Sequence, residues 1–333
     1  MRAIRTVDYH TAGEPFRIVV GGVDVLPGPD VPARRAHAMA HLDDVRALLV
    51  NEPRGHADMY GCFVTPPDDG DGDLGVVFFH NDGFSTACGH GTIALVTWAL
   101  DDGVIARTGA QTRVVVDAPS GRLVTTATSE DGRVSRVAFR NVAAYVHATG
   151  LEVALPDRAV SVDVAFGGAF YAVLPAAEVD CAVVAEDLPA LVAAGRAIKA
   201  AIEAEHEVVH PTAEHLRDVY GVIFVDQTRR DGDVLEQRNV AIFADGEVDR
   251  SPTGSGVSAR LALLDADGTL PRGHTLVTTG IAGQSFVGRV VDDAEVDGRP
   301  AVVPEVTGSA HRTGTHTFTL DPHDPLGTGF LLR

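Results

Sequence analysis

Short runs in which apolar and polar residues alternate recur along the chain, and this period of two predicts strands. Four other stretches repeat apolar residues at helical spacing. The strands are expected at 3–7, 16–20, 58–64, 74–79, 113–117, 122–128, 134–141, 161–164, 170–174, 222–225 and 237–243, with a polar turn at 10–15. The helices are expected at 33–50, after Cys88, around Lys199 and at 257–264. This succession predicts a mixed α/β chain.

An internal repeat divides the chain into two related halves. A shift of 165 residues places Cys88 on Thr253 and aligns two glycine-rich turns, each followed by a helix that ends in Asp-Gly. We expect a first half at 1–150, to which a C-terminal strand at about 316–333 returns, and a second half at 151–315. The aligned pairs are Gly89 with Gly254, Gly91 with Gly256, Ala94 with Ala259, Asp102 with Asp267 and Gly103 with Gly268.

The first glycine turn joins a cysteine to the start of an apolar helix. The segment Cys88-Gly89-His90-Gly91 leaves backbone N–H groups of the first helical turn without intrahelical acceptors, so the turn is suited to an anion. A cysteine at a helix N-terminus is biased toward the thiolate. This half therefore offers a carboxylate anchor beside a proton acceptor.

The pseudo-twofold repeat predicts that the two turns face each other across a cleft. Two helix N-termini would then hold the carboxylate of a small amino or imino acid, with Cys88 on one side of its α-carbon and Thr253 on the other. Asp249, four residues before Thr253, is either the ligand of the substrate amine or a turn residue.

Composition restricts the partners. The chain has 333 residues and a net charge of -19, which argues against nucleic acid and against an anionic membrane surface. Residues 1–22 contain no continuous apolar segment of the kind found in signal peptides. Three scattered cysteines, of which Cys62 and Cys181 are expected in buried strands, are typical of a reducing compartment, so we expect a cytoplasmic location.

The sequence argues against pyridoxal phosphate, a zinc ion and a dinucleotide as cofactors. The single lysine, Lys199, lies among the polar positions of an amphipathic helix, which disfavours pyridoxal phosphate. Cys88 and His90 lack a second Cys or His pair to complete a zinc site. Gly89 and Gly91 match part of a dinucleotide fingerprint, but the nine residues after Phe79 are too many for the tight turn it requires. We expect no metal and no cofactor.

Five motifs in order along the chain resemble the proline racemase family, which includes hydroxyproline epimerases and trans-3-hydroxy-L-proline dehydratases. They are HTAGEPFR at 10–17, ACGHGT at 87–92, DRSPTGSG at 249–256, GIAGQSFVG at 280–288 and DPLGTGF at 324–330. The resemblance implies a diaminopimelate-epimerase-like α/β (α+β) fold with two pseudo-symmetric halves. Each half would be a curved, mostly antiparallel sheet around a central helix, and the active site would lie in the cleft between the halves.

The resemblance also implies residue roles and a cofactor-independent reaction on a small imino acid. Cys88 matches the catalytic cysteine, and Asp249 matches the residue that binds the ring nitrogen. The carboxylate-binding turns match Gly89 and His90 together with Gly254 and Ser255. A homodimer is compatible with the resemblance, although no stretch of the sequence indicates one.

Thr253 departs from the racemases and epimerases, which carry a second cysteine at this position. Inversion of an α-carbon needs a base on one face and an acid on the other, and a threonine hydroxyl is too weak an acid. A carbanion with a β-hydroxyl can expel water instead, so we expect dehydration of trans-3-hydroxy-L-proline to a pyrroline carboxylate.

Three alternatives remain: a 4-hydroxyproline 2-epimerase or proline racemase, a dinucleotide-dependent oxidoreductase, and a non-catalytic amino-acid-binding protein. The group that protonates the departing hydroxyl is also open, among Thr253, His90 and an ordered water.

Overall fold

The computed structural model describes residues 3–332, which form two compact units. Of these residues, unit 1 contains those up to Phe139 and those from Ser309 onward, and unit 2 is Arg140–Gly308. The boundaries expected at residues 150 and 315 fall inside strands β8 (Tyr145–Ala154) and β19 (Ala310–Phe318).

Unit 1 is a sheet in which the last strand of the chain pairs with the first. Antiparallel β19 pairs with β1, β1 pairs with β2 antiparallel, and β2 pairs with β3 parallel. Strand β4 then pairs with β3 antiparallel and with β5 parallel, and β6 is antiparallel to β5. The strands are β1 (Ile4–Thr11), β2 (Glu14–Gly21), β3 (Tyr60–Thr65), β4 (Leu74–His80), β5 (Gln111–Ala118), β6 (Gly121–Glu130) and, across the unit boundary, β7 (Arg133–Arg140).

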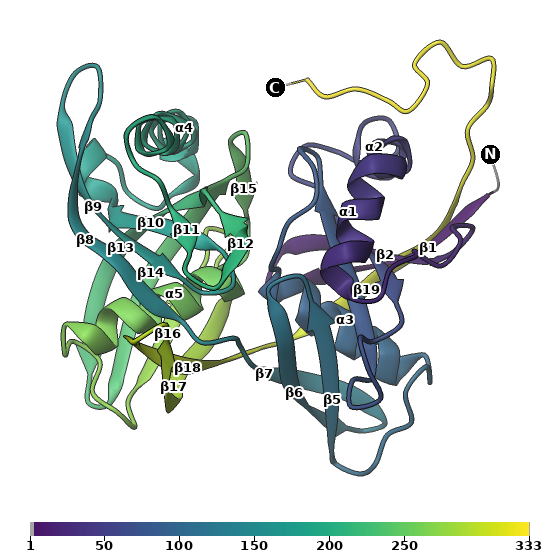
Figure 1. Ribbon diagram of the computed structural model, residues 1–333, viewed down its shortest axis with the longest axis horizontal. Coiled ribbons are helices and arrows are strands. Elements are labelled where there is room, and N and C mark those ends of the chain that lie inside the picture. Colours follow the sequence, from purple (N-terminus) through teal and green to yellow (C-terminus); the bar gives the residue numbers. More distant parts are fainter. Residues whose placement is uncertain (1–2, 333) are drawn as a thin grey trace. The chain divides into compact units, whose positions relative to one another are not determined.

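Helix α3 (Gly89–Asp101) is the central helix of unit 1, because it contacts β1, β2, β3, β6 and β19. All of its residues except the last are buried. Helices α1 (Val31–His41) and α2 (Asp43–Val50) instead pack on β4. In Figure 1 the yellow C-terminal strand runs beside the purple N-terminal strand of this unit.

Unit 2 repeats this arrangement with different strands. From β8 to β17 the successive pairings are antiparallel, antiparallel, parallel, antiparallel, parallel and antiparallel, the same series as from β19 to β6 in unit 1. The strands are β9 (Ala159–Phe166), β10 (Phe170–Pro175), β13 (Val219–Asp231), β14 (Val234–Phe243), β16 (Thr275–Thr279), β17 (Ser285–Val296) and β18 (Arg299–Gly308). The sequence repeat therefore has a matching strand order.

Helix α5 (Gly254–Ala266) takes the place of α3 in unit 2, and it contacts β8, β9, β10, β17 and β18. Helix α4 (Leu188–Glu205) packs instead on β13, β14 and β8. The remaining elements are β11 (Val209–His210) with β12 (Ala213–Arg217), β15 (Glu247–Asp249) beside β14, and short 3-10 helices at Ala176–Val179 and Ala185–Asp187.

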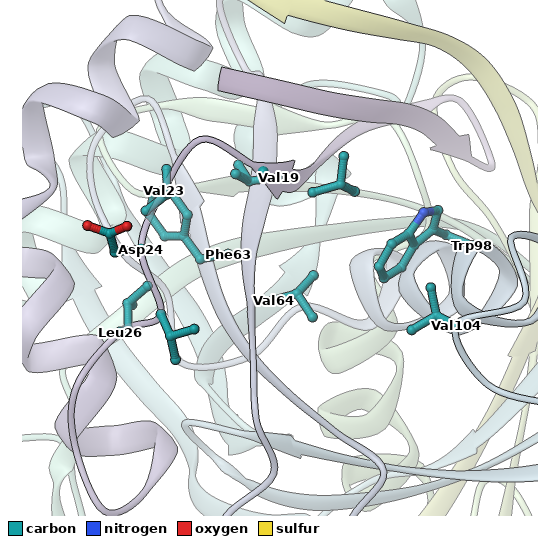
Figure 2. A pocket seen from close by; sticks show the side chains of 11 residues that line it. Val19, Val23, Asp24, Leu26, Phe63, Val64, Trp98 and Val104 are labelled. Atoms are coloured by element: carbon teal, nitrogen blue, oxygen red, sulfur yellow. The ribbon is translucent and has the colours of Figure 1, made fainter. Parts of the chain in front are cut away.

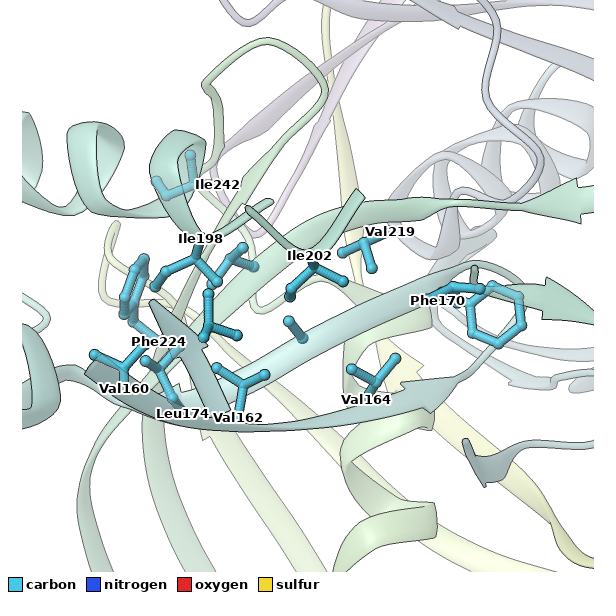
Figure 3. Packing of buried hydrophobic residues seen from close by; sticks show 14 of the residues in the cluster. Val160, Val162, Val164, Phe170, Leu174, Ile198, Ile202, Val219, Phe224 and Ile242 are labelled. Carbon is cyan, nitrogen blue, oxygen red and sulfur yellow. The ribbon is translucent and has the colours of Figure 1, made fainter. Parts of the chain in front are cut away.

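The period of two in the strands explains why helices cover both faces of the sheet in unit 2. On β9 the side chains of Val160, Val162 and Val164 pack with Ile198 and Ile202 of α4, as Figure 3 shows. The neighbouring Ala165 belongs to a second cluster, which contains residues of α5. Phe170, Leu174 and Phe224 extend the first cluster, while Tyr171, Val173 and Ile223 extend the second.

The expected α/β fold, with two similar halves built around central helices, is confirmed. The single helix expected at 33–50 is wrong, because Leu42, at φ -126°, separates α1 from α2. Cys62 lies in a buried strand as expected, whereas Cys181 is half-buried in a connection outside any strand. The polar turn expected at 10–15 is limited to Ala12 and Gly13, both at positive φ, as in a two-residue hairpin turn.

Candidate active site

Cys88 is the N-cap residue of α3 and is only 5% exposed. Its Sγ accepts a hydrogen bond from the backbone N–H of Gly91 at 3.2 Å. The sulfur therefore does what a serine or aspartate side chain ordinarily does at an N-cap. A thiolate at this position gains from the partial positive charge of the helix N-terminus, so the local structure favours the reactive form of the cysteine.

Gly91 is required for this arrangement. A Cβ at this position would lie 2.6 Å from the Sγ of Cys88 and 2.3 Å from Cε2 of Phe16. Phe16 is fully buried and packs against Tyr60 and Phe78, so a shift of its ring would disturb the packing of both neighbours. The absence of a side chain at residue 91 thus holds the sulfur close to the backbone of the first helical turn.

His90 lies directly beside the thiol. Its ring makes T-shaped contacts with the rings of Phe16 and Tyr60, and the hydroxyl of Thr11 donates to its carbonyl oxygen at 2.9 Å. The Sγ of Cys88 is 3.6 Å from Nδ1 and 3.4 Å from Nε2. Because the two nitrogens flank one ring carbon, these nearly equal distances place the sulfur over the face of the ring rather than along either N–H bond. The contact is therefore a sulfur–aromatic one more than a conventional hydrogen bond.

In unit 2 the corresponding helix, α5, has Thr253 as its N-cap residue. The Thr253 hydroxyl does not cap the helix but donates to Oδ2 of Asp249 at 2.8 Å. The other carboxylate oxygen accepts the backbone N–H of Ser251 at 2.8 Å, and the Ser251 hydroxyl accepts the N–H of Thr253 at 3.1 Å. Asp249 and Thr253 are 3% and 6% exposed. The loop is thus folded around a carboxylate with a fixed orientation.

Thr253 has a backbone conformation that is unusual for a β-branched residue. Its φ is +64°, in the region that favours glycine and costs other residues free energy. Such strained positions cluster at functional sites. A glycine or asparagine would relieve the strain but would remove the hydroxyl that binds Asp249.

The first turn of α5 carries a second buried hydroxyl. Ser255 Oγ is 2.7 Å from the hydroxyl of Tyr171 on β10, and the two residues are 3% and 1% exposed. This contact fixes the Ser255 side chain at the helix N-terminus. The N–H groups of Gly254 and Ser255 belong to the first turn, whose donors have no intrahelical acceptor and are suited to an anion.

The predicted site residues thus fall into two clusters. Unit 1 brings together Cys88, Gly89 and His90, and unit 2 brings together Asp249, Thr253, Gly254 and Ser255. Sequence reasoning missed Ser251 and Tyr171. The position of Ser251 between Asp249 and Thr253 could have indicated the turn, whereas no sequence signal connects Tyr171 to Ser255 before the fold is known. The cleft between the halves stays a prediction.

A cavity of about 340 Å³ in unit 1 is distinct from these clusters, because none of the predicted site residues lines it. Figure 2 shows its apolar side chains, among them Phe63, Leu26 and Trp98, with Asp24 as the only charged one. Within residues 3–332, no group of three or more His, Cys, Asp or Glu side chains is arranged to hold a metal ion. In the same residues, no helix is both long and apolar enough to cross a membrane.

The model of the proline racemase family matches residues 6–331. The chain belongs to this family. The resemblance of the five motifs is therefore confirmed, and the sheets described above are not the doubly wound parallel sheet that a dinucleotide-dependent oxidoreductase would need.

Curated relatives match almost the whole chain. A trans-3-hydroxy-L-proline dehydratase of Bacillus thuringiensis subsp. konkukian is 45% identical over 327 residues, which are 98% of this chain and 97% of the relative. A dehydratase of the same name from Burkholderia cenocepacia is 43% identical over all of this chain and 99% of the relative. A 3-hydroxyproline 2-epimerase of Burkholderia multivorans is also 43% identical, with the same coverage.

Solved structures agree with the fold. A hydroxyproline epimerase of Agrobacterium vitis with bound trans-4-hydroxy-L-proline superposes with a TM-score of 0.92 at 30% identity, over 100% of this chain and 97% of that one. A phenazine biosynthesis protein of the PhzF family from Bacillus anthracis superposes with a TM-score of 0.58 at 13% identity, over 96% and 100%. The second likeness shows the fold alone.

Proposed function

We propose that this protein is a cofactor-independent hydro-lyase that removes water from trans-3-hydroxy-L-proline to give a pyrroline-2-carboxylate. The observation that carries the proposal is that residue 253 is a threonine. An enzyme that inverts the α-carbon needs a second acid of workable strength, and Thr253 supplies only a hydroxyl that is already bonded to Asp249. The names of the dehydratase relatives support the same reaction.

Each site residue has a proposed role. Cys88 is the base that removes the α-proton, since its sulfur lies at a helix N-terminus that favours the thiolate. The N–H groups of Gly89, His90, Gly254 and Ser255 bind the carboxylate at two helix N-termini. Asp249, whose carboxylate is oriented by Ser251 and Thr253, binds the secondary ammonium of the ring.

The decisive experiment is a direct assay. Purified protein, without added metal or pyridoxal phosphate, is incubated with trans-3-hydroxy-L-proline, trans-4-hydroxy-L-proline and L-proline in parallel. We expect 1-pyrroline-2-carboxylate from the first substrate alone. No product from trans-3-hydroxy-L-proline would overturn the proposal. Cys88→Ser should abolish turnover, because a serine hydroxyl without a partner is a poor base.

A second candidate is a 2-epimerase of 3- or 4-hydroxyproline, or a proline racemase. It is favoured by the epimerase name of one relative that is as similar to this chain as some of the dehydratases. The two activities differ in their products: an epimerase incorporates solvent deuterium at the α-carbon of an inverted hydroxyproline, whereas the dehydratase releases an achiral pyrroline. Thr253→Cys should add α-exchange with inversion, because it supplies the second thiol.

The cellular setting of the enzyme is part of the same proposal. We place the enzyme in the cytoplasm with no macromolecular partner other than, at most, a second copy of itself. Cell fractionation and sedimentation equilibrium of the purified protein test these two points independently of the assay.

A further inference from the structure

The stereochemistry of the proposed substrate restricts the acid that protonates the leaving hydroxyl. In trans-3-hydroxy-L-proline the hydroxyl and the carboxylate lie on opposite faces of the ring, and the α-hydrogen is opposite the carboxylate. The α-hydrogen and the hydroxyl therefore share one face, and loss of water is a syn elimination. The base and the acid must approach this same face, an argument that rests on the proposed function.

Thr253 is unsuited to be this acid. Its hydroxyl has one proton, which it donates to the buried carboxylate of Asp249 at 2.8 Å. A hydrogen bond to an ionised acceptor is about twice as strong as one between neutral groups, so the proton is held in this direction. In this structure the Thr253 hydroxyl orients the Asp249 carboxylate.

Cys88 is the base in the proposed reaction and so already faces the α-hydrogen. We propose that Cys88 performs both proton transfers. Its thiolate takes the α-proton, so the Cα–H bond breaks and an S–H bond forms. The carbon electron pair then forms the Cα=Cβ bond as the C–O bond breaks, and the thiol returns its proton to the departing hydroxide. Water leaves, the thiolate is restored, and the enamine rearranges to 1-pyrroline-2-carboxylate without a net exchange of protons with the enzyme.

The surroundings of the sulfur suit both transfers. The N–H of Gly91, at 3.2 Å, and the N-terminus of α3 stabilise the thiolate, and they therefore also make the thiol a better acid. The sulfur lies over the face of the His90 ring rather than along an N–H bond. The proton therefore need not pass through the imidazole on its way to the hydroxyl.

A change of leaving group tests the assignment. Fluoride is a far weaker base than hydroxide, so trans-3-fluoro-L-proline needs much less help from an acid. For each variant the kcat for the hydroxy substrate is divided by the kcat for the fluoro substrate, which cancels any loss of folded enzyme or of α-proton removal. Removal of a general acid should lower this ratio by about 10²–10⁴-fold.

We expect the ratio for Thr253→Val and for His90→Asn to stay within about tenfold of wild type. Thr278→Val is the matched control, since this buried hydroxyl has no hydrogen-bond partner among the described residues. A larger fall with Thr253→Val would assign the acid to Thr253, and one with His90→Asn would assign it to His90. Either result would overturn the single-residue mechanism.

The wild-type enzyme gives an independent test that needs no variant. In cis-3-hydroxy-L-proline the hydroxyl lies on the face opposite the α-hydrogen, out of reach of the returning thiol. We expect this isomer to be dehydrated at least about 100-fold more slowly than the trans isomer, and equal or faster turnover would overturn the inference. Failure of the wild-type enzyme to dehydrate the trans isomer would instead overturn the proposed function.

Discussion

Gly91→Ala is the substitution for which the structure gives the sharpest prediction. The added Cβ would lie 2.6 Å from the Sγ of Cys88, whereas ordinary contact begins at 3.4 Å. The other close atoms, Cε2 and Cζ of Phe16 at 2.3 and 2.6 Å, belong to a fully buried ring. To restore ordinary contact at 3.4 Å, the Phe16 ring must shift by roughly 1.1 Å and the sulfur by roughly 0.8 Å, so the substitution displaces Sγ together with the ring.

Two effects on stability oppose each other. Overpacking a buried site costs about 1–3 kcal/mol. Replacing glycine by alanine within a helix contributes about 1 kcal/mol in the other direction. We therefore expect a net destabilisation of about 0–2 kcal/mol, so the protein stays folded. A misplacement of about 1 Å at a reacting group costs about 100-fold in rate, so kcat should fall far more than stability does.

The assay measures kcat for dehydration together with thermal unfolding. Gly70→Ala is the control, because a Cβ at this glycine would meet no atom within 4 Å. A Gly91→Ala variant that retains more than a third of the wild-type kcat would refute the reasoning that residue 91 positions the sulfur. A variant that fails to fold would refute the stability estimate instead.

Three further predictions concern stability and binding. Arg17→Met removes the guanidinium that pairs with the buried carboxylate of Asp8 at 2.7 Å. It should lower the free energy of unfolding, measured with urea, by about 3–5 kcal/mol. Tyr171→Phe should raise KM about fivefold with little change in kcat, because loss of about 1 kcal/mol of hydrogen bonding frees the Ser255 hydroxyl. Burial, and to a smaller extent nearby positive charge, lowers the pKa of His210 below 6.5. The unfolded chain therefore binds more protons than the folded one in this range, so the free energy of unfolding should fall as the pH falls from 7.5 to 5.5.

Each of these has a matched control. Arg289→Met removes an ion pair with Glu305 whose arginine is 60% exposed, and it should cost less than about 1 kcal/mol. Tyr145→Phe removes a buried hydroxyl with no hydrogen-bond partner in residues 3–332 and should leave KM unchanged. His210→Gln should flatten the pH dependence. Equal costs for the two arginines, equal KM effects for the two tyrosines, or stability that rises toward pH 5.5 would contradict the respective reasoning.

The helices that carry the candidate site could be predicted from sequence because their signals are local. Each begins after a small-residue turn and ends at an Asp-Gly pair, and Gly103 and Gly268 indeed adopt positive φ at these ends. The strand predicted at 74–79 is one residue shorter than β4, and it could be predicted because the run is apolar and bounded by turns.

The parts that sequence could not give depend on contacts between distant residues. Strand β8 and the strands from β16 to β18 have polar or irregular patterns, since one side of them is exposed, and the sequence pattern does not predict them. The C-terminal strand expected at about 316–333 corresponds to β19, which lies at Ala310–Phe318. The hydrogen bond between Thr253 and Asp249 depends on a turn that forces φ to +64°, which a threonine does not favour by itself. Tyr171 and Ser255 meet only because β10 lies beside α5.

The return of β19 to unit 1 determines the order in which the chain can fold during synthesis. The partner of β1 from Ile4 onward is Ala310–Phe318, which the ribosome makes only after all of unit 2. Unit 2, by contrast, is a continuous segment, Arg140–Gly308, and all of its own strands are available earlier. Unit 2 can thus fold before unit 1 is complete, so a released fragment that ends at residue 308 should protect unit 2 from protease while β1 still lacks β19.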